Sequence, residues 1–314
     1  MNKSYYSLNQ YCLDTFGEKV YRLSLNGGMS CPNRDGSLGI GGCIFCSEGG
    51  SGDFASDYDN SISAQIASAK ERIVKKTNCK KFIAYFQAYT NTYAPVSYLR
   101  RIFTEAISQP DIVALSIGTR CDCLPEDVLD LLEELNHIKP VWVELGLQTI
   151  HPTTHGILNT HTTVEQYDQA FMALSSRGIS VITHVILGLP GESKAMMLET
   201  VRHISKLCSC HTASHTQASI PPHYGIKLQL LHILRETALA TLYEENPFPL
   251  FELEEYCDFI VDCLEILPPK VVIHRLTGDG PRKLLIDPLW STDKKRVLNT
   301  IHKKLQERNK IECN

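Results

Sequence analysis

Strand-like and helix-like segments alternate along most of this 314-residue chain. Short apolar runs typical of buried strands lie at residues 19–25, 81–87, 112–118, 141–148, 180–187 and 226–232. Helical patterns separate them, at residues 61–76, 96–108, 125–135, 164–177 and 192–207. Because such alternation favours a parallel sheet with right-handed crossovers, the chain is predicted to form an α/β fold, an open, partial (β/α)6 TIM barrel. In barrels of this kind the chemistry lies at the carboxyl ends of the strands.

More segments follow the barrel pattern. Helical patterns lie at residues 235–243 and 251–267, and a last strand at residues 270–276 precedes a basic tail. We therefore predict an N-terminal extension over residues 1–18, a barrel core over residues 19–240 and a C-terminal extension of helices and a strand over residues 241–314. Arg275 and Asp279, at the exit of the last strand, are candidates for substrate contact.

A glycine-rich loop directly after the first strand carries three cysteines, Cys31, Cys43 and Cys46. The short gap between Cys43 and Cys46 lets two thiolates face one metal centre, and the residues between can bring Cys31 to the same point. A structural zinc site takes a fourth protein ligand, whereas an iron–sulfur cluster held by three cysteines keeps one iron open for a small molecule. On spacing alone, a zinc knuckle and ordinary buried thiols stay open as alternatives.

Four blocks of sequence together resemble one family. Residues 31–36 read CPNRDG, residues 42–46 read GCIFC, residues 85–92 read YFQAYTNT and residues 187–192 read LGLPGE. In this order they are similar to the YhcC-like proteins of the radical S-adenosylmethionine (SAM) superfamily, relatives of the Elongator catalytic subunit. The resemblance runs along nearly the whole chain and implies a partial barrel of the radical SAM type.

The resemblance also implies chemistry. A [4Fe–4S] cluster on Cys31, Cys43 and Cys46 would bind SAM through its open iron, with a flavodoxin- or ferredoxin-type electron donor supplying the electron. Cleavage of SAM leaves methionine and a 5′-deoxyadenosyl radical, which abstracts hydrogen from the substrate. Members of the group are associated with tRNA wobble-uridine modification, in which a carboxymethylaminomethyl side chain is trimmed toward aminomethyl.

Residues near the first, second and fourth strands are predicted to contact these cofactors. Phe45 would shield one side of the cluster, and Gln87 and Thr90 resemble the motif that holds the amino group of SAM. Glu144 and Gln148 share one face of their strand by the period-two rule, predicted to be the barrel interior. Related enzymes bind the ribose hydroxyls and methionyl amine from that strand. A satisfied core pair is the alternative for Glu144 and Gln148, and a hydrogen-bonded loop without ligand is the alternative for Gln87 and Thr90.

The turn after the fifth strand contains Gly188 and Gly191, whose missing side chains let the main chain approach a flat ring. By resemblance it is the turn that contacts the adenine of SAM. His184, on the same strand, could donate a proton or hold the substrate, but a lone histidine on an apolar strand is more often hydrogen-bonded core.

The sequence leaves open the function of two cysteine-containing segments. After the third strand, Arg120 suits a carboxylate, and Cys123 is a substrate-side thiol or, like Cys121, a plain loop cysteine. Residues 208–223 are rich in Cys, His, Ser and Thr. We interpret them as an insertion loop, because their Cys-x-Cys spacing is poor for metal binding.

Net charge limits how this chain could bind nucleic acid. A net charge of −4 gives no global attraction to nucleic acid, so RNA would have to meet a local patch. Two basic runs are candidates, each of which could equally be a solvated helix face. The N-terminal basic run is Lys70, Arg72, Lys75, Lys76, Lys80 and Lys81, and the C-terminal basic run is Lys294, Lys295, Arg296, Lys303, Lys304, Arg308 and Lys310.

Twelve irregularly scattered cysteines do not indicate a disulfide framework, and neither a membrane-spanning run nor a signal peptide is evident. We expect a cytoplasmic protein. The predicted function is a radical SAM enzyme that modifies tRNA wobble uridine. The alternatives are a radical SAM enzyme acting on a small metabolite and a zinc-stabilised RNA-binding module without catalysis; the sequence does not fix the oligomeric state.

Overall fold

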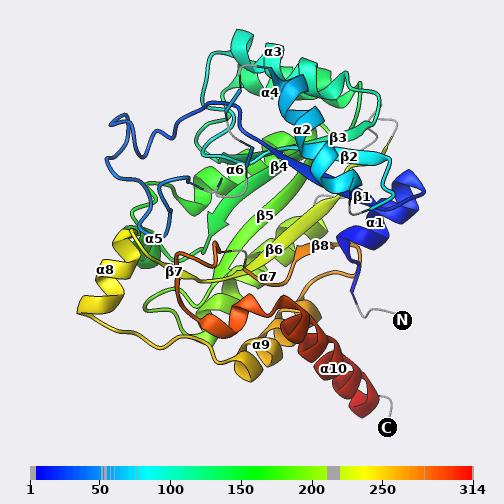
Figure 1. Ribbon diagram of the computed structural model, residues 1–314. Helices are drawn as coiled ribbons and strands as arrows, with labels where there is room; N and C mark the ends of the chain where they lie inside the picture. Colours follow the sequence, from blue (N-terminus) through cyan, green and yellow to red (C-terminus); the bar gives the residue numbers. More distant parts are fainter. Residues whose placement is uncertain are drawn as a thin grey trace.

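Seven parallel strands form one curled sheet in the order β1-β2-β3-β4-β5-β6-β8 (Figure 1). The computed structural model describes residues 5–50, 52, 55–56, 58–59, 61–75, 77–210, 220–278 and 280–312. The strands of the sheet are β1 (Val20–Leu25), β2 (Lys81–Phe86), β3 (Ile112–Arg120), β4 (Val141–Gln148), β5 (Ser180–Leu187), β6 (Tyr224–Leu230) and β8 (Val272–Arg275). Strands β7 (Ile233–Leu234) and β9 (Leu285–Asp287) form a separate antiparallel pair.

Helices follow most strands and cover the outer face of the sheet, as the crossovers of a partial barrel require (Figure 1). They are α2 (Ile62–Val74), α3 (Val96–Ile107), α4 (Glu126–Asn136), α5 (Pro152–Leu158), α6 (Val164–Ser176) and α7 (Lys194–Cys210). Before the sheet lies α1 (Leu8–Phe16), and toward the C-terminus lie α8 (Ala238–Glu245), α9 (Leu253–Ile266), the 3-10 helix Leu289–Thr292 and α10 (Lys294–Glu312). α10 packs on α9, and Tyr5 contacts His302 of α10, so the two ends of the described chain meet.

The six predicted strands and the helices between them are present, with ends shifted by a few residues. The last predicted strand, β8, pairs in parallel with β6 and becomes a seventh strand of the same sheet. Sequence patterns missed α1 and α5, since each is short, and α5 ends at Asn159 in a left-handed conformation. The basic tail, predicted only as a charged segment, is the long helix α10. The domain boundaries stay a prediction.

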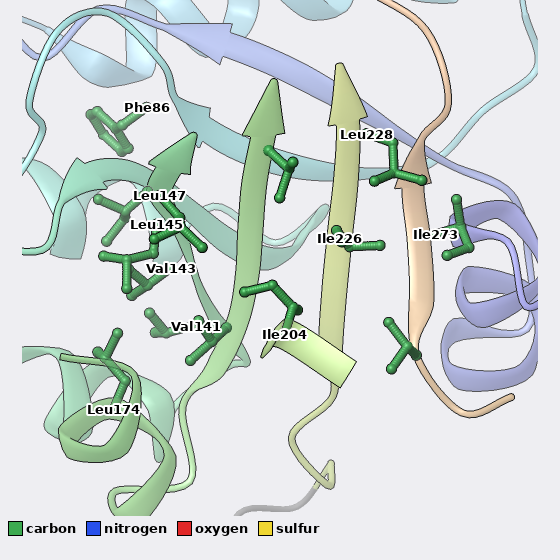
Figure 2. Packing of buried hydrophobic residues seen from close by; sticks show 14 of the residues in the cluster. Phe86, Val141, Val143, Leu145, Leu147, Leu174, Ile204, Ile226, Leu228 and Ile273 are labelled. Atoms are coloured by element: carbon green, nitrogen blue, oxygen red, sulfur yellow. The ribbon is translucent and has the colours of Figure 1, made fainter. Parts of the chain in front are cut away.

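The outward side chains of the strands make the main core. On β4 these are Val141, Val143, Leu145 and Leu147, which pack with Leu174 of α6 in one cluster, shown in Figure 2. Each is at most 1% exposed, and burying a side chain of this size stabilises the fold by about 1.5–3 kcal/mol. Alternate residues of the same strand, beginning with Trp142, face the barrel interior.

At the amino ends of the strands, the barrel interior is apolar. Trp142 packs there with Ile83, Ala114, Ile182 and Val272, in a cluster separate from the main core. Helix α1 closes this end with Tyr11 and Cys12, and the ring of Tyr11 meets that of Trp142 edge to face, 5.9 Å between centroids. Because α1 closes the amino end, the cavities described below lie toward the carboxyl ends of the strands.

No helix in the described part of the chain is both long and apolar enough to cross a membrane.

Candidate functional site

The loop after β1 brings its three cysteines to the carboxyl end of the sheet. Cys31, Cys43 and Cys46 are all half-buried and line one cavity. The amide of Cys46 donates to the carbonyl of Cys43 at 3.0 Å, a tight turn that puts both thiols on one side. Positive φ angles at Gly41 and Gly42 permit the sharp path into this turn.

Two polar side chains hold the loop in place. Asn33 is fully buried, and its amide donates to the carbonyl of Asn159 at 2.6 Å and to the sulfur of Cys43 at 3.5 Å. Asn159 returns a bond to the carbonyl of Gly42 at 3.0 Å. Arg34 donates to the carbonyls of Ser47, at 2.5 Å, and Glu48, at 3.2 Å. The loop is therefore fixed to the end of α5 and to itself mainly through backbone carbonyls, and Cys43 is the one of its three thiols that these side chains contact.

The surroundings of the thiols favour the thiolate form of Cys43. A hydrogen bond with Cys46 lowers the pKa of Cys43 to about 7, and Arg120, Asn33 and Arg34 act in the same direction. The hydrogen bond with Cys43 and then burial hold the pKa of the Cys46 thiol well above its usual value, and the nearby Cys31 acts in the same direction. Since thiolates are the metal-binding form, three adjacent thiols beside cationic and amide donors fit an iron–sulfur cluster.

Among the described residues, no three Cys, His, Asp or Glu side chains are grouped to hold one metal ion. Each cysteine of a [4Fe–4S] cube binds a different iron, so the spacing that such a cube needs differs from that of a single-ion site.

A cavity of about 110 Å³ lies beside the thiols. It collects residues from the carboxyl ends of four strands and from the cysteine loop. Of the predicted cofactor contacts, it is lined by Phe45, Gln87, Thr90, Glu144 and Gln148. The structure thus brings most of the predicted set together around Cys31, Cys43 and Cys46, while the role of each residue stays a prediction.

Gln148 owes its position to a local irregularity. It has a positive φ of 65°, and the pairing of β4 with β5 shifts register between Gly146 and Gln148. A Cβ on Gly146 would lie 2.7 Å from the amide nitrogen of Gln148, so only glycine leaves room for this side chain to fold back over the strand.

Gly188 and Gly191 are not among the lining residues of this cavity or of the neighbouring one. A Cβ on Gly188 would meet the ring of Phe251 at 3.2 Å, and one on Gly191 would meet Ile157 at 3.9 Å. The nearest preceding residue that does line the neighbouring cavity is Ile186 of β5. The adenine contact predicted for this turn stays a prediction.

A group of polar and ionic side chains, which we call the charged layer, lies inside the barrel between the apolar amino end and the cavities. Its members come from β1 to β6 and are Arg22, Tyr85, Ser116, Glu144, His184 and Lys227.

Glu144 is the centre of the charged layer, and its side chain has no exposed surface. Its carboxylate accepts from Ser116 Oγ and His184 Nε2, both at 3.0 Å, and from the ammonium of Lys227. The guanidinium of Arg22 lies 3.2 Å away. These contacts match the alternative interpretation of Glu144 as a satisfied core group, so a SAM contact would have to compete with them.

The charges of the layer depend on one another. Burial alone would raise the pKa of Glu144, but Lys227 and Arg22 outweigh it and hold that pKa well below its usual value. Burial lowers the pKa of Lys227 despite Glu144, and burial together with Lys227 lowers the pKa of His184 to about 4. His184 is therefore neutral at pH 7 and donates Nε2–H to Glu144.

The sequence analysis did not single out Arg22, Tyr85 or Lys227. A signal was present, since Arg22 and Lys227 are cations inside otherwise apolar strands, at positions whose neighbours face outward. A buried cation needs a partner, so each could have been matched to Glu144.

A second cavity, of about 160 Å³, adjoins the first and shares Phe45, Cys46 and Gln87 with it. Its far wall carries Lys227 and Arg275, two of its cations. Arg275 was a predicted substrate contact, and Asp279, the other, lies outside the described residues.

The undecided thiols are not among the lining residues of either cavity, although burial raises the pKa of Cys123 and Cys31 lies near enough to add to that effect. Cys121 and Cys123 are buried, and burial raises the pKa of Cys121 to about 12. Arg120 forms a bidentate pair with Asp122, at 2.8 and 2.7 Å. Of the predicted insertion loop, residues 211–219 lie outside the described residues.

In each basic run, three of the described residues pair with neighbouring acids. In the N-terminal basic run, Lys70 pairs with Asp111 and Lys81 with Glu18. In the C-terminal basic run, Lys304 pairs with Asp258 of α9, 2.8 Å away. Arg308 likewise pairs with Asp262 and Glu265 of α9. Lys304 and Arg308 thus join α10 to α9, and for the paired residues the described contacts support the interpretation as structural faces.

Comparisons with known proteins agree with this architecture. A family model described as "Radical SAM superfamily" matches residues 31–204, and one described as "Radical_SAM C-terminal domain" matches residues 224–307. The uncharacterized protein YtqA of Bacillus subtilis is 42% identical over 306 residues, covering 98% of this chain and 91% of that protein. The protein YhcC of Escherichia coli is 38% identical over 276 residues, covering 88% and 84%.

More distant relatives include a protein whose name states an activity and a protein of known structure. A tRNA uridine(34) acetyltransferase of Methanocaldococcus jannaschii is 25% identical over 201 residues, which is 64% of this chain and 34% of that protein. Among solved structures, Elp3 of Methanocaldococcus infernus superposes with a TM-score of 0.64 at 18% identity, covering 91% of this chain and 63% of that one. This superposition confirms the predicted partial barrel.

Proposed function

The chain belongs to the radical SAM superfamily, and on that premise we propose that Cys31, Cys43 and Cys46 hold a [4Fe–4S] cluster beside the SAM-binding cavity. The family uses this cluster together with SAM, and its members need a reductant. The observation that carries the assignment is that the three thiols share one cavity with Gln87, Thr90 and Gln148 at the carboxyl ends of the strands. A bound cluster supplies the electron that cleaves SAM.

Protein side chains would bind and orient SAM. Gln87 and Gln148 bear amides that hydrogen-bond polar groups of the cofactor, and Phe45 covers one side of the thiol loop. Glu144 keeps the cations Arg22 and Lys227 in place below, so that the floor of the cavity is polar but fixed. Packed walls exclude water and stray hydrogen donors from the reacting atoms.

For the substrate, we propose tRNA, with trimming of a carboxymethylaminomethyl group on the wobble uridine toward aminomethyl. Support comes from the similarity to a protein named as a tRNA uridine(34) acetyltransferase. The second cavity adds to it, because the guanidinium of Arg275 in its lining suits a substrate that carries a carboxylate. Analysis of tRNA nucleosides from a deletion strain tests this proposal, and an unchanged wobble-uridine profile would contradict it.

The cluster assignment is tested on protein purified without oxygen. Cys46→Ala is expected to lose reductive SAM cleavage to background, measured as 5′-deoxyadenosine, together with much of its iron and sulfide. Cys210→Ala is the matched control, since this exposed thiol at the end of α7 lies outside the cavity lining. Wild-type 5′-deoxyadenosine formation by Cys46→Ala would refute the assignment.

A further inference from the structure

The side chain of Asn33 connects the cysteine loop to one of its own thiols. Its amide nitrogen lies 3.5 Å from the sulfur of Cys43 and 2.6 Å from the carbonyl oxygen of Asn159. A side-chain amide has two N–H donors, so one can serve the sulfur while the other serves the carbonyl. Asn33 is therefore a neutral donor directed at a residue that we propose as a cluster ligand.

The orientation of this amide is determined by its neighbours. If the amide were rotated by half a turn, its oxygen would face the carbonyl oxygen of Asn159 at 2.6 Å, and two acceptors repel each other. Instead, the oxygen Oδ1 is buried and has no hydrogen-bond partner among the described residues. Leaving a buried acceptor unpaired costs free energy, so the side chain keeps this orientation because of the groups that its N–H donors meet.

The backbone holds Asn33 and Cys43 at a fixed separation. Gly42, the residue before Cys43, donates its amide to the carbonyl of Asn33 at 2.8 Å. A Cβ on Gly39 would lie 2.5 Å from Oδ1 of Asn33, so this glycine lets the loop close over the side chain. Asn33 has no exposed surface, so bulk water does not compete for its N–H donors.

A buried N–H beside a ligating sulfur acts unequally on the two redox states of a cluster. Reduction adds one electron, and part of the added negative charge falls on the sulfurs. The positive end of an N–H dipole stabilises that charge, and it does so more strongly in a protein interior than in water. Hydrogen bonds to the sulfurs are among the features that set the potential of protein-bound clusters. Asn33 should therefore favour the reduced state.

We propose that Asn33 acts through Cys43 to raise the reduction potential of the cluster, so that a flavodoxin- or ferredoxin-type donor reduces it more readily. In this step the donor loses one electron and the cluster gains it. The inference rests on the proposed function, because it takes Cys43 to be a cluster ligand. It gives Asn33 a role beyond holding the loop, which its bond to Asn159 already serves.

The test measures the midpoint potential of the reconstituted cluster by an EPR-monitored redox titration without SAM. Asn33→Leu removes both N–H donors at nearly unchanged volume and without adding a charge. Asn159→Gly is the matched control, because it removes the bond from the Asn159 side chain to the carbonyl of Gly42 but keeps the carbonyl that Asn33 uses. Asn159 has a positive φ of 55°, which glycine adopts readily.

For Asn33→Leu we expect the equilibrium constant of reduction to fall about ten-fold, which is about 59 mV for a one-electron couple. The control should stay within about two-fold of the wild-type constant, because it loosens the same loop without touching the sulfur. Equal shifts in the two variants, or a wild-type potential in Asn33→Leu, would overturn the inference and leave the cluster assignment standing. Wild-type protein without a reducible cluster would overturn both.

A second measurement covers the case in which Asn33→Leu binds no cluster. Wild-type protein carrying ¹⁵N in the side-chain amide of asparagine is reduced and studied by pulsed EPR, which detects a nitrogen hydrogen-bonded to a cluster sulfur through its hyperfine coupling. A ¹⁵N coupling is the expected result. Its absence from a fully reduced cluster would overturn the inference.

Discussion

The two halves of the barrel interior differ sharply, although the same strands build them. At the amino end, Trp142 packs on Tyr11 among apolar neighbours. Two residues later on the same face of β4, Glu144 joins Arg22 and Lys227 in the charged layer. The apolar amino half stabilises the fold by packing. In the other half, burying charges costs desolvation free energy, and the result is a set of fixed charges beneath the cavities.

The largest expected effect tests whether the charged layer is held together by Glu144. Glu144→Leu should lower the free energy of unfolding by about 5 kcal/mol, because it leaves the buried Lys227 without its anion. Glu144→Leu/Lys227→Met should regain part of this loss, since the fully buried ammonium is then gone and the partly exposed Arg22 is the member of the layer left without its anion. Urea unfolding of the cofactor-free protein measures both.

Glu134→Leu provides the control for that comparison. Glu134 pairs with Arg100 on the surface, where solvent screens the pair, so its loss should change stability little. If Glu144→Leu costs no more than this control, the charged layer is not an interdependent unit.

A slightly smaller effect is expected at the apolar end. Trp142→Ala should lower the free energy of unfolding by about 4 kcal/mol through lost burial and the cavity that remains. SAM cleavage per folded molecule should be unchanged, because Trp142 lines neither cofactor cavity. Trp142→Phe should cost less, and a loss of activity in folded Trp142→Ala would show that the two halves are not separable.

The smallest effect per unit of change concerns how the free energy of unfolding depends on pH through His223. His223, between Tyr11 and Trp142, bonds His274 at 3.1 Å, and burial lowers the pKa of His223 to about 3. A histidine kept neutral in the folded state but protonated in the unfolded state stabilises fully above its unfolded pKa, near 6.5. Stability should therefore fall as the pH drops from about 6.5 toward 3.

For His223 this loss amounts to about 1.4 kcal/mol per pH unit, and His223→Phe should remove that contribution. The check is urea unfolding at a series of pH values between 7 and 4. A variant whose stability keeps the full wild-type pH slope would show that His223 is not the titrating group.

Much of the fold could be predicted because strand and helix periods are local. Each apolar run at residues 81–87, 112–118 and 141–148 became a strand near its expected limits. The cysteine loop was equally visible, because ligands close in sequence must also be close in space. Short elements such as α5 escaped, since a few residues carry too little periodicity.

Partners from distant segments could not be predicted. Whether Lys304 faces RNA or an acid depends on α9 lying beside α10, which no local pattern specifies. The same holds for Lys227 and Glu144, which β6 and β4 bring together across the barrel.

The sequence alone determined the alternation of strands and helices, the three-cysteine loop and membership of the superfamily, because each is written in neighbouring residues. Only the tertiary structure decided which charges are paired and which line a cavity. Arg22 and Lys227 lie on different strands, yet both reach the carboxylate of Glu144, whereas Lys304 on α10 pairs with Asp258 of α9. The reason is physical: electrostatic energy depends on distances in space and on burial, which are set when the sheet curls and the helices pack against it.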